Sequence, residues 1–513
     1  MINNILRRPP WRTTAISVAV GLALSACAVG PDFRTPDAPR VADAGHPYTP
    51  APLPAMAASS ASPVYVPQHF VDGQDISASW WEAFQSPALN ALVQSALAHS
   101  PTVAAAQATL RQAEENYHAD YGSKIFPSVT GQLSATRSRQ ALAQSAQVPA
   151  GYTSNLFQAG LDLSYTLDIV GGNRRELESV RAAIDVQRFQ VEATWLSLTS
   201  SVVATAIQEA SLRAQIKATQ GVIDNETASL KVISRQVELG AVGRSAALQQ
   251  QTLVAQSQAE LPALEKSLAQ TRHQLAVLAG RLPGDADLPS FDIDAIVLPR
   301  ELPLSVPSAL VRQRPDVRAA EAQLHEASAQ IGVATAALYP QITLSAGVDR
   351  QSLKLDKLFD TGTTGWSLAA GLVQPIFNGG ALRAKKRAAV AAYDAAQAQY
   401  QSTVLNAFLN VANTLRAIDT DAEAVTANAD AERLANEALD LVQRQYQLGA
   451  VSYLSSLDAQ RTALSTRVAL VQARAARFTD TAALFQALGG GWWNAPDAVA
   501  SAASAGSASS ATR

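Results

Sequence analysis

Polar and apolar residues alternate strictly between Phe157 and Ile169, where every second side chain is apolar. A period of two places each kind of side chain on one face of a β-strand. Similar segments follow Phe126-Pro127 and, twice, Tyr339-Pro340. About ten residues suffice for a tilted strand to cross a bilayer. The pattern therefore predicts four strands of membrane-crossing length, near residues 127–139, 156–169, 340–350 and 365–377.

The apolar faces of these strands could rest on a soluble core, which is the commoner use of such alternation. Aromatic residues at the strand ends instead favour a membrane, where they form interfacial girdles; these residues are Phe126, Phe157, Tyr339, Trp366 and Phe377. Unpaired strand edges in lipid cost several kcal/mol for each backbone group, so four strands can close only by oligomerisation. Closure would turn Asp162, Asp168 and Asp349 toward a lumen and Leu161, Leu163 and Leu344 toward lipid.

One very long helix is predicted after each pair of strands. Residues Asn173–Leu239 contain no proline and one glycine, and residues Ala381–Leu448 contain neither. At 1.5 Å per residue each helix would be about 100 Å long. A second helix is expected after each, ending near Gly280 and Gly489, so that each half of the chain ends in a helical hairpin.

The chain contains an internal duplication with an offset of about 210 residues. Arg235–Val242 matches Arg444–Val451, and both runs contain Leu-Gly-Ala-Val at the expected hairpin turn. The duplication and the flanking composition predict a signal peptide at 1–26, an extended linker at 27–76, repeats at 77–285 and 305–493 joined by a linker at 286–304, and a disordered tail at 494–513.

The amino terminus has the pattern of a secreted, lipid-modified protein. Three arginines precede an apolar stretch of about ten residues, which is too short to span a membrane. Leu24-Ser25-Ala26-Cys27 then resembles a bacterial lipobox, and Cys27 is the only cysteine. We therefore expect an S-diacylglycerol group and an N-palmitoyl chain on Cys27, together with delivery to the outer membrane.

Composition excludes several other classes of function. The net charge is −3 and charged residues make up 16% of the chain. The sequence therefore has no strongly basic patch of the kind that binds nucleic acid. The six histidines are scattered without metal-ligand spacing, and no motif of a hydrolase, a nucleotide-binding loop or a zinc protease is present. We expect no catalytic residues, no metal and no cofactor other than the covalent lipid.

Several motifs together resemble the lipoprotein (NodT/OprM-type) branch of the TolC-like outer membrane factors. They include Val29-Gly30-Pro31-Asp32-Phe33, Trp80–Phe84, Arg314–Val317, Leu457–Arg461 and Gly489–Trp492. The resemblance covers residues 27–493 and implies a homotrimer whose strands close a 12-stranded barrel in outer membrane lipid. A long periplasmic α-helical tunnel would continue the barrel. Such proteins are exit ducts of tripartite efflux systems, with a periplasmic adaptor (membrane fusion protein) and an inner-membrane efflux pump as partners.

The resemblance also implies a gate at the periplasmic end, formed by Leu454, Asp458 and Arg461. Spacings of four and three place these residues on one helix face, and a ring of three Asp458 carboxylates would favour cations. Without the resemblance, Asp458 could instead be a solvated surface carboxylate paired with Arg461. In the first repeat their equivalents are Ser245 for Leu454 and Gln249 for Asp458. The adaptor would dock at the turns, which comprise Leu239, Gly240, Ala241, Val242, Leu448, Gly449, Ala450 and Val451.

One alternative is a lipid-anchored periplasmic adaptor, which would also have a lipobox and a long α-hairpin. The duplication and the four strands argue against it, because an adaptor needs one hairpin and no barrel. Drugs and other small toxic compounds are the expected cargo, but the sequence does not identify the exported compound or the pump.

Overall fold

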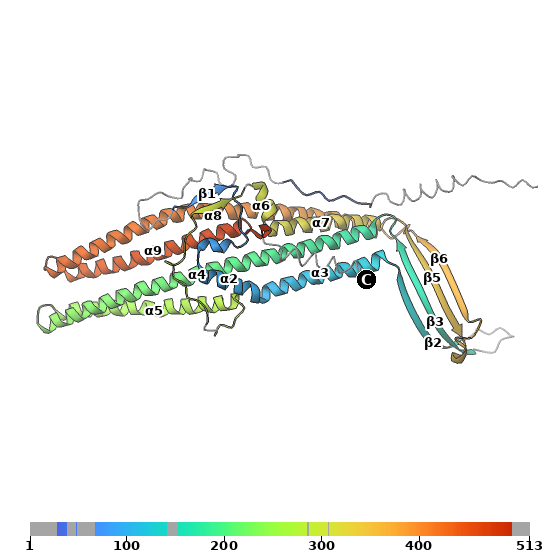
Figure 1. The fold of residues 1–513 in the computed structure, drawn as a ribbon, viewed down its shortest axis with the longest axis horizontal. Coiled ribbons are helices and arrows are strands. Elements are labelled where there is room, and N and C mark those ends of the chain that lie inside the picture. The colour runs from blue at the N-terminus through green and yellow to red at the C-terminus, as the bar shows by residue number, and fades with distance from the viewer. Residues whose placement is uncertain are drawn as a thin grey trace, which may run out of the picture. The chain divides into compact units, whose positions relative to one another are not determined.

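The structure is a computed structural model that describes residues 28–37, 48, 67–140, 152–284, 287–305 and 307–494. The predicted signal peptide, Cys27 and the tail from residue 495 lie outside these residues. The chain forms two compact units (Figure 1). The strand unit comprises the described residues within 1–36, 109–187 and 320–400, and the hairpin unit those within 37–108, 188–319 and 401–513. Each unit thus combines parts of both sequence repeats.

The strand unit contains an antiparallel sheet with the order β2-β3-β5-β6. Its strands are β2 (Ser128–Gln140), β3 (Tyr152–Leu167), β5 (Gln341–Ser352) and β6 (Thr364–Val373). All four predicted strands are therefore present. β6 ends four residues before Phe377 because Pro375 has no N–H group to donate to a neighbouring strand.

The register of the sheet places the apolar residues of all four strands on one face. Leu163 pairs with Val129 on one side and with Ala346 on the other, and Ala346 pairs with Leu368. One residue further along each strand, Asp162 pairs with Gly347. Because side chains alternate between faces, every register step separates an apolar row from a polar row.

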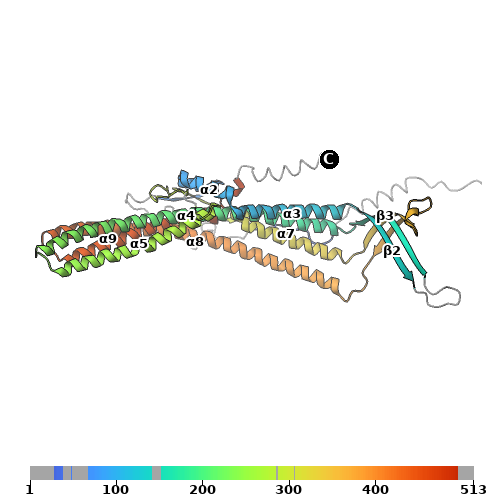
Figure 2. The same cartoon turned by 90° about the horizontal axis from the view of Figure 1, so that it is seen from below.

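Two helices of 67 residues each, α4 (Gly172–Glu238) and α8 (Ala381–Gln447), follow the sheet strands β3 and β6. Each continues through a turn into a helix of 35 residues, α5 (Arg244–Leu278) and α9 (Tyr453–Ala487). Both hairpins are visible in Figure 2. The predicted bounds hold to within a few residues, since neither long segment contains a proline to interrupt its backbone hydrogen bonds. No helix in the described part of the chain has the length and apolar character that crossing a membrane requires.

Shorter helices complete both units. They are α2 (Pro87–His99), α3 (Pro101–Ile125), α6 (Pro307–Gln313) and α7 (Pro315–Ala336), with short 3-10 turns at Trp80–Phe84, Leu355–Lys357 and Trp492–Asn494. Asn494 belongs to the last of these turns, so the expected tail does not begin at this residue.

The core of the hairpin unit forms around Trp80 and Phe84, which are 1% and 0% exposed. The Trp80 ring stacks on Phe485 of α9, with centroids 5.4 Å apart. Ile207 of α4 and Leu415 of α8 belong to the same buried cluster. The motif Trp80–Phe84 therefore joins both helical hairpins through apolar burial.

Each of the two predicted linkers contains a short strand. Residues His69–Asp72 form strand β1, which pairs in parallel with β4 (Glu301–Leu304) of the inter-repeat segment. The buried carboxylate of Glu209 on α4 supports this inter-repeat segment, accepting hydrogen bonds from Arg272 and from the backbone N–H of Phe291. Both linkers are therefore partly held by long-range hydrogen bonds, which composition does not reveal.

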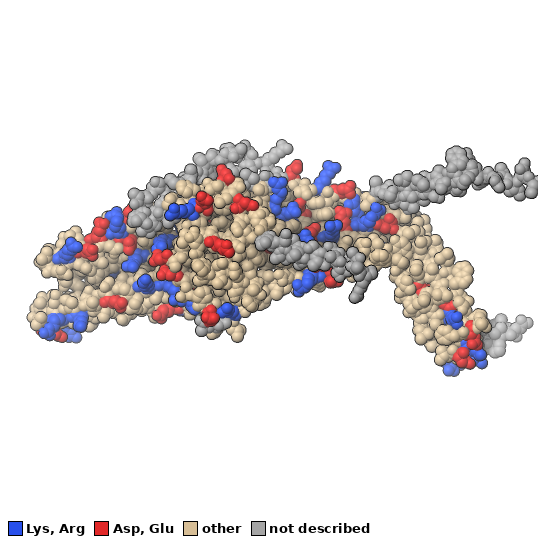
Figure 3. All heavy atoms as spheres, in the orientation of Figure 1, with Lys and Arg blue, Asp and Glu red and all other residues tan. Residues whose placement is uncertain are grey.

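Charged residues of both signs are interspersed over the helices on the face drawn in Figure 3. The sheet is largely uncharged on that face, apart from its end near the β5–β6 connection. There Lys357 forms an ion pair with Asp360 at 3.1 Å. Arg137 and Arg139 lie in the last four residues of β2, and Arg350 lies in the last three of β5, so the arginines of the apolar face are at strand ends.

Candidate functional site

The ends of the two helical hairpins have the same backbone geometry. Gly240 and Gly449 follow the long helices with φ of 74° and 75°, a conformation that glycine adopts without a steric penalty. The amides of Ala241 and Ala450 each donate 2.8 Å hydrogen bonds, to the carbonyls of Gln236 and Gln445. These are matching Schellman motifs, so the repeated Leu-Gly-Ala-Val sequence builds the same helix end twice. Leu239 and Leu448 remain 69% and 84% exposed.

The second helix of each hairpin starts differently. Ser452 caps α9, because its side chain accepts a hydrogen bond from the Ser455 amide at 3.3 Å. Gly243 occupies the corresponding place before α5 and has no side chain to do this. Leu454 lies in the first turn of α9 and is 64% exposed, and Asp458 is exposed one turn later. The structure thus places these two expected gate residues on the surface of one chain.

Arg461, the third expected gate residue, contacts the other hairpin. Its Nη2 donates to Oε1 of Gln256 on α5 at 2.7 Å. Ser245 and Gln249, the counterparts of Leu454 and Asp458, are also exposed on α5. The two hairpins are therefore joined by a polar contact at the level of the expected gate. Sequence reasoning missed Gln256, because its partner lies 205 residues away.

A buried polar cluster lies beneath this contact. Glu226 of α4 and Gln250 of α5 are 1% and 0% exposed, and Nε2 of Gln250 donates to the Glu226 carbonyl at 2.9 Å. Oε2 of Glu226 and Oε1 of Gln250 have no hydrogen-bond partner among the residues that the structure describes. Burial raises the pKa of Glu226, although a hydrogen bond with Ser257 and the charge of Arg461 oppose this shift. Both residues belong to the first hairpin, so the packing of α4 against α5 depends on the hydrogen bonds of this cluster.

A cavity of about 580 Å³ opens between the hairpin ends. Its lining includes Ala241, Val242 and Gly449 of the two turns together with Tyr446 and Tyr453. The two tyrosine rings lie 5.5 Å apart, and the Tyr446 hydroxyl donates to Gln236 at 3.4 Å. The turns expected to dock an adaptor thus border a concave surface that both hairpins form. The sequence contains one signal for these tyrosines: aromatic residues flank the turn of the second repeat, whereas none flank the turn of the first repeat.

The aspartates expected in a lumen do not share one position. Asp162 and Asp349 lie on the polar face of the sheet, and Asp349 pairs with Gly160 and with Gly365. Asp168 lies beyond the end of β3, which is a correction to the predicted strand. Its carboxylate accepts hydrogen bonds from the amides of Asn173 and Arg174, both at 3.1 Å. Asp168 therefore satisfies the free N–H groups at the start of α4.

Within the described residues, no cluster of three or more histidine, cysteine, aspartate or glutamate side chains could hold a metal ion. The candidate functional surfaces are the ends of the two hairpins and the apolar face of the sheet.

The sequence matches the profile of the outer membrane efflux protein family over residues 92–281 and 306–490. Each matched segment falls within one sequence repeat. Pyoverdine export outer membrane protein OpmQ of Pseudomonas aeruginosa is 32% identical over 450 residues, covering 86% of this chain and 94% of OpmQ. Toluene efflux pump outer membrane protein TtgC of Pseudomonas putida is 30% identical over 484 residues, covering 93% and 96%.

Solved structures show the same similarity. The outer-membrane channel OprN superposes with a TM-score of 0.81 at 28% identity, covering 91% of this chain and all of OprN. The open state of the Neisseria gonorrhoeae outer membrane channel MtrE gives a TM-score of 0.76 at 27% identity, covering 91% and 99%.

Proposed function

The chain belongs to the outer membrane efflux protein family, and from this membership we propose that three copies form the exit duct of a tripartite efflux system. The protein is an outer membrane efflux channel and not an enzyme. The proposed duct closes a 12-stranded barrel from three four-stranded sheets and continues it into the periplasm with the helices.

The observation that carries this proposal is the four-stranded sheet with one apolar face. Leu161 and Trp366 on that face are 54% and 79% exposed in the single chain. Among the described residues, the outer strands β2 and β6 have no second partner. Exposed strand edges are avoided in lipid because their N–H and C=O groups need partners. Joining β2 of one copy to β6 of the next would pair both edges and turn the apolar face toward lipid.

The gate of the proposed duct consists of Leu454, Asp458 and Arg461. Leu454 and Asp458 are exposed at the start of α9, where three symmetry-related copies could approach a common axis. An apolar ring resists wetting and a carboxylate ring repels anions, so together they restrict ion flow. The contact between Arg461 and Gln256 supports the proposal, because it ties the gate helix α9 to the other hairpin.

The docking surface for a periplasmic adaptor comprises the two Leu-Gly-Ala-Val turns and the cavity between them. The exposed Leu239 and Leu448 supply apolar contact area, and the cavity supplies a concave surface. A helical hairpin of an adaptor could lay apolar side chains against this surface. The inner-membrane pump would then connect through the adaptor.

A lipid on Cys27 is part of the same proposal. The lipobox supports an S-diacylglycerol and an N-palmitoyl chain, and several acyl chains hold a protein at a membrane at about 0.8 kcal/mol per buried methylene. The names of the relatives refer to pyoverdine and to toluene. Two chemically different compounds suggest that the pump selects the cargo, so we assign small organic compounds as the cargo class.

The test is a strain lacking this channel, in which export of a fluorescent dye and of toxic compounds is measured with and without the full-length protein. Restored export, together with trimers seen by native mass spectrometry in detergent, is the expected result. Monomers that remain soluble without detergent after the lipid is removed would instead indicate a lipid-anchored adaptor.

A further inference from the structure

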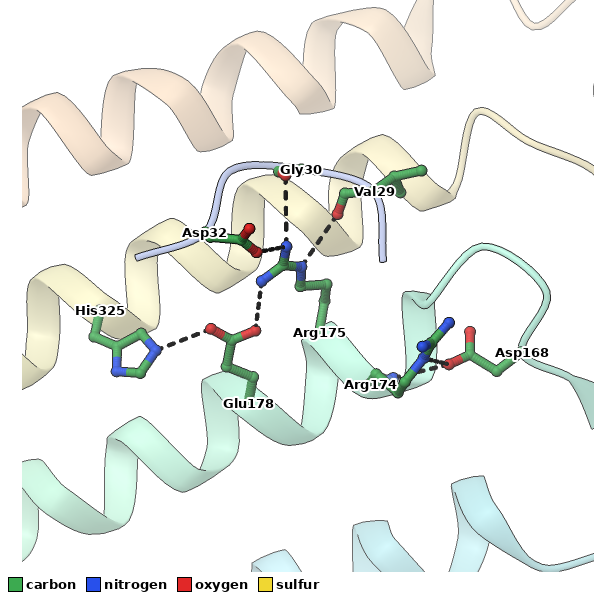
Figure 4. A network of polar contacts seen from close by, with 8 residues as sticks. All are labelled: Val29, Gly30, Asp32, Asp168, Arg174, Arg175, Glu178 and His325. Carbon is green, nitrogen blue, oxygen red and sulfur yellow. Dashed lines mark hydrogen bonds and ion pairs between the residues drawn. The ribbon is translucent and has the colours of Figure 1, made fainter. Parts of the chain in front are cut away.

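The run Ala28-Val29-Gly30-Pro31-Asp32-Phe33 lies against the strand unit, between α4 and α7 (Figure 4). This strap, residues 28–33, directly follows the expected lipid site. The Val29 amide donates to the Val170 carbonyl at 3.0 Å, at the connection between β3 and α4. The start of the predicted extended linker is therefore bound to the folded protein.

Arg175 of α4 recognises the backbone and the carboxylate of the strap. Its Nε donates to the Val29 carbonyl at 3.2 Å, and its Nη2 donates to the Gly30 carbonyl at 3.5 Å and to Asp32 Oδ1 at 2.6 Å. The Arg175 side chain is only 6% exposed. A buried guanidinium needs acceptors for its N–H groups, and the strap supplies three of them.

The fourth acceptor of Arg175 extends the network to the neighbouring helix. Nη1 of Arg175 donates to Glu178 Oε2 at 2.7 Å, and Glu178 Oε1 lies 2.9 Å from Nε2 of His325 on α7. The Phe33 ring stacks on His325, with centroids 4.4 Å apart and planes inclined by 13°. The far end of the strap therefore rests on a side chain that α4 also holds in place.

The groove for the strap is shaped by glycines. A Cβ atom at Gly332 of α7 would lie 2.6 Å from Cγ of Arg175 and 3.0 Å from the Val29 carbonyl oxygen. A Cβ at Gly30 would lie 2.5 Å from Cα of Gly332, and a Cβ at Gly171 would lie 2.5 Å from Cα of Ala28. Real Cβ atoms do not approach other atoms so closely, so this depth of burial requires glycine on both sides of the contact.

The groove lies where two helices of the strand unit meet the sheet. α4 follows β3 and α7 precedes β5, and these two strands are paired in the sheet through Leu167 and Ile342. The strap thus contacts both helices that enter the central strand pair.

We propose that the groove formed by Arg175, Gly332 and His325 is a binding site for the chain's own amino-terminal peptide, residues 28–33, which fixes the tether to the base of the β3–β5 pair. The peptide is recognised as an extended ligand by its carbonyls, by Asp32 and by the Phe33 ring. The consequence for membrane anchoring rests on the proposed lipid at Cys27, whereas the binding of the strap does not.

Arg34 provides a natural probe of strap binding, because trypsin cleaves after arginine and needs several flanking residues in an accessible, extended form. The full-length protein in detergent would be treated with trypsin, and release of the peptide that ends at Arg34 would be followed by mass spectrometry. Arg175→Ala and Gly332→Val should each accelerate this cleavage by about tenfold or more, since local opening governs proteolysis.

Gly122→Val on α3 is the matched control, because a Cβ atom added there meets nothing within 4 Å. Arg174→Ala controls for the loss of a cation, since Arg174 pairs with Asp168 instead. Both controls should be cleaved at the wild-type rate. If Arg175→Ala fails to fold, Asp32→Ala tests the same contact, because the Asp32 side chain is 90% exposed and its loss disturbs no core.

Equal rates of cleavage after Arg34 in the wild type and in the three groove and strap variants would overturn the proposed binding site. These variants are Arg175→Ala, Gly332→Val and Asp32→Ala. Cys27→Ser should still be cleaved slowly, because the groove contacts residues 28–33 and not the lipid. The readout does not require export. A protein that exports nothing but retains slow cleavage would refute the duct and leave the strap intact.

Discussion

Arg461 of α9 and Gln256 of α5 join the two helical hairpins, with Nη2 of Arg461 donating to Oε1 of Gln256 at 2.7 Å. The two residues come from different repeats, and both side chains are exposed to solvent. In the proposed duct, opening requires the hairpins to move apart, and this contact would then break. An adaptor could drive that movement only by binding the open state more tightly than the closed state.

Replacing Gln256 with Leu should therefore favour the open duct. Loss of one hydrogen bond is worth about 1 kcal/mol, which corresponds to about a fivefold change in the ratio of open to closed channels. Single-channel recording in planar bilayers measures this ratio. Gln251→Leu, a change on the same helix, should leave it unchanged. Identical recordings for wild type and Gln256→Leu would show that the contact does not restrain the gate.

Removing the gate side chains should raise single-channel conductance. In Asp458→Ala combined with Leu454→Ala, the proposed carboxylate and apolar rings disappear and the constriction widens. The corresponding change in the first repeat, Ser245→Ala with Gln249→Ala, should have much less effect. Equal increases from both pairs, or none from the α9 pair, would place the constriction elsewhere.

Arginine on the lipid-facing side of the sheet should prevent stable insertion. Leu163→Arg would cost about 2–4 kcal/mol per chain near the bilayer midplane. Ser164→Arg lies one residue further on the opposite face and should be tolerated, because that face is proposed to be wet. Heat-resistant trimers on semi-native gels measure assembly. Loss of trimers with Ser164→Arg but not with Leu163→Arg would reverse the assignment of the two faces.

Changing Cys27 to Ser should abolish acylation and leave the precursor uncleaved or mislocalised. Only a thiol can take the diacylglycerol thioether that precedes cleavage in lipoprotein processing, and a hydroxyl is no substitute. Mass spectrometry of the mature amino terminus, with cell fractionation, measures the outcome. An unmodified Cys27 at the terminus of the wild-type protein would refute the lipid assignment.

Glu192 of α4 should make the hairpin unit less stable at higher pH. Burial raises the pKa of this carboxyl to about 7, although the charge of Arg188 opposes the shift. Between about pH 4.5 and 7, the folded chain therefore retains a proton that the unfolded chain has lost, so the free energy of unfolding falls as pH rises. Above pH 7 the deficit reaches about 3 kcal/mol, at 1.36 kcal/mol for each pKa unit.

Glu192→Gln removes the titrating group and should raise the melting temperature at pH 8 relative to the wild type, with little difference at pH 4.5. Thermal unfolding in detergent followed by circular dichroism measures both. The same difference between variant and wild type at the two pH values would show that Glu192 titrates normally in the folded protein.

The strands, the long helices and the hairpin turns could all be predicted from the sequence, since each depends on neighbours along the chain. A period of two in polarity determines which residues share a strand face, and it identified Leu161 and Asp162 correctly on opposite faces. The absence of proline allowed two helices of 67 residues. Gly240 and Gly449 ended them, because glycine accepts a positive φ.

Other features depend on residues that only folding brings together. β1 pairs with a strand more than 220 residues away, Arg461 reaches Gln256, and the strap at Val29 binds Arg175. Asp168 had the right polarity for the strand but caps α4 instead. Local polarity and propensity constrain a residue's own element, whereas the burial of Arg175 or Glu192 and the partners of each polar group follow from long-range packing, which no local pattern specifies.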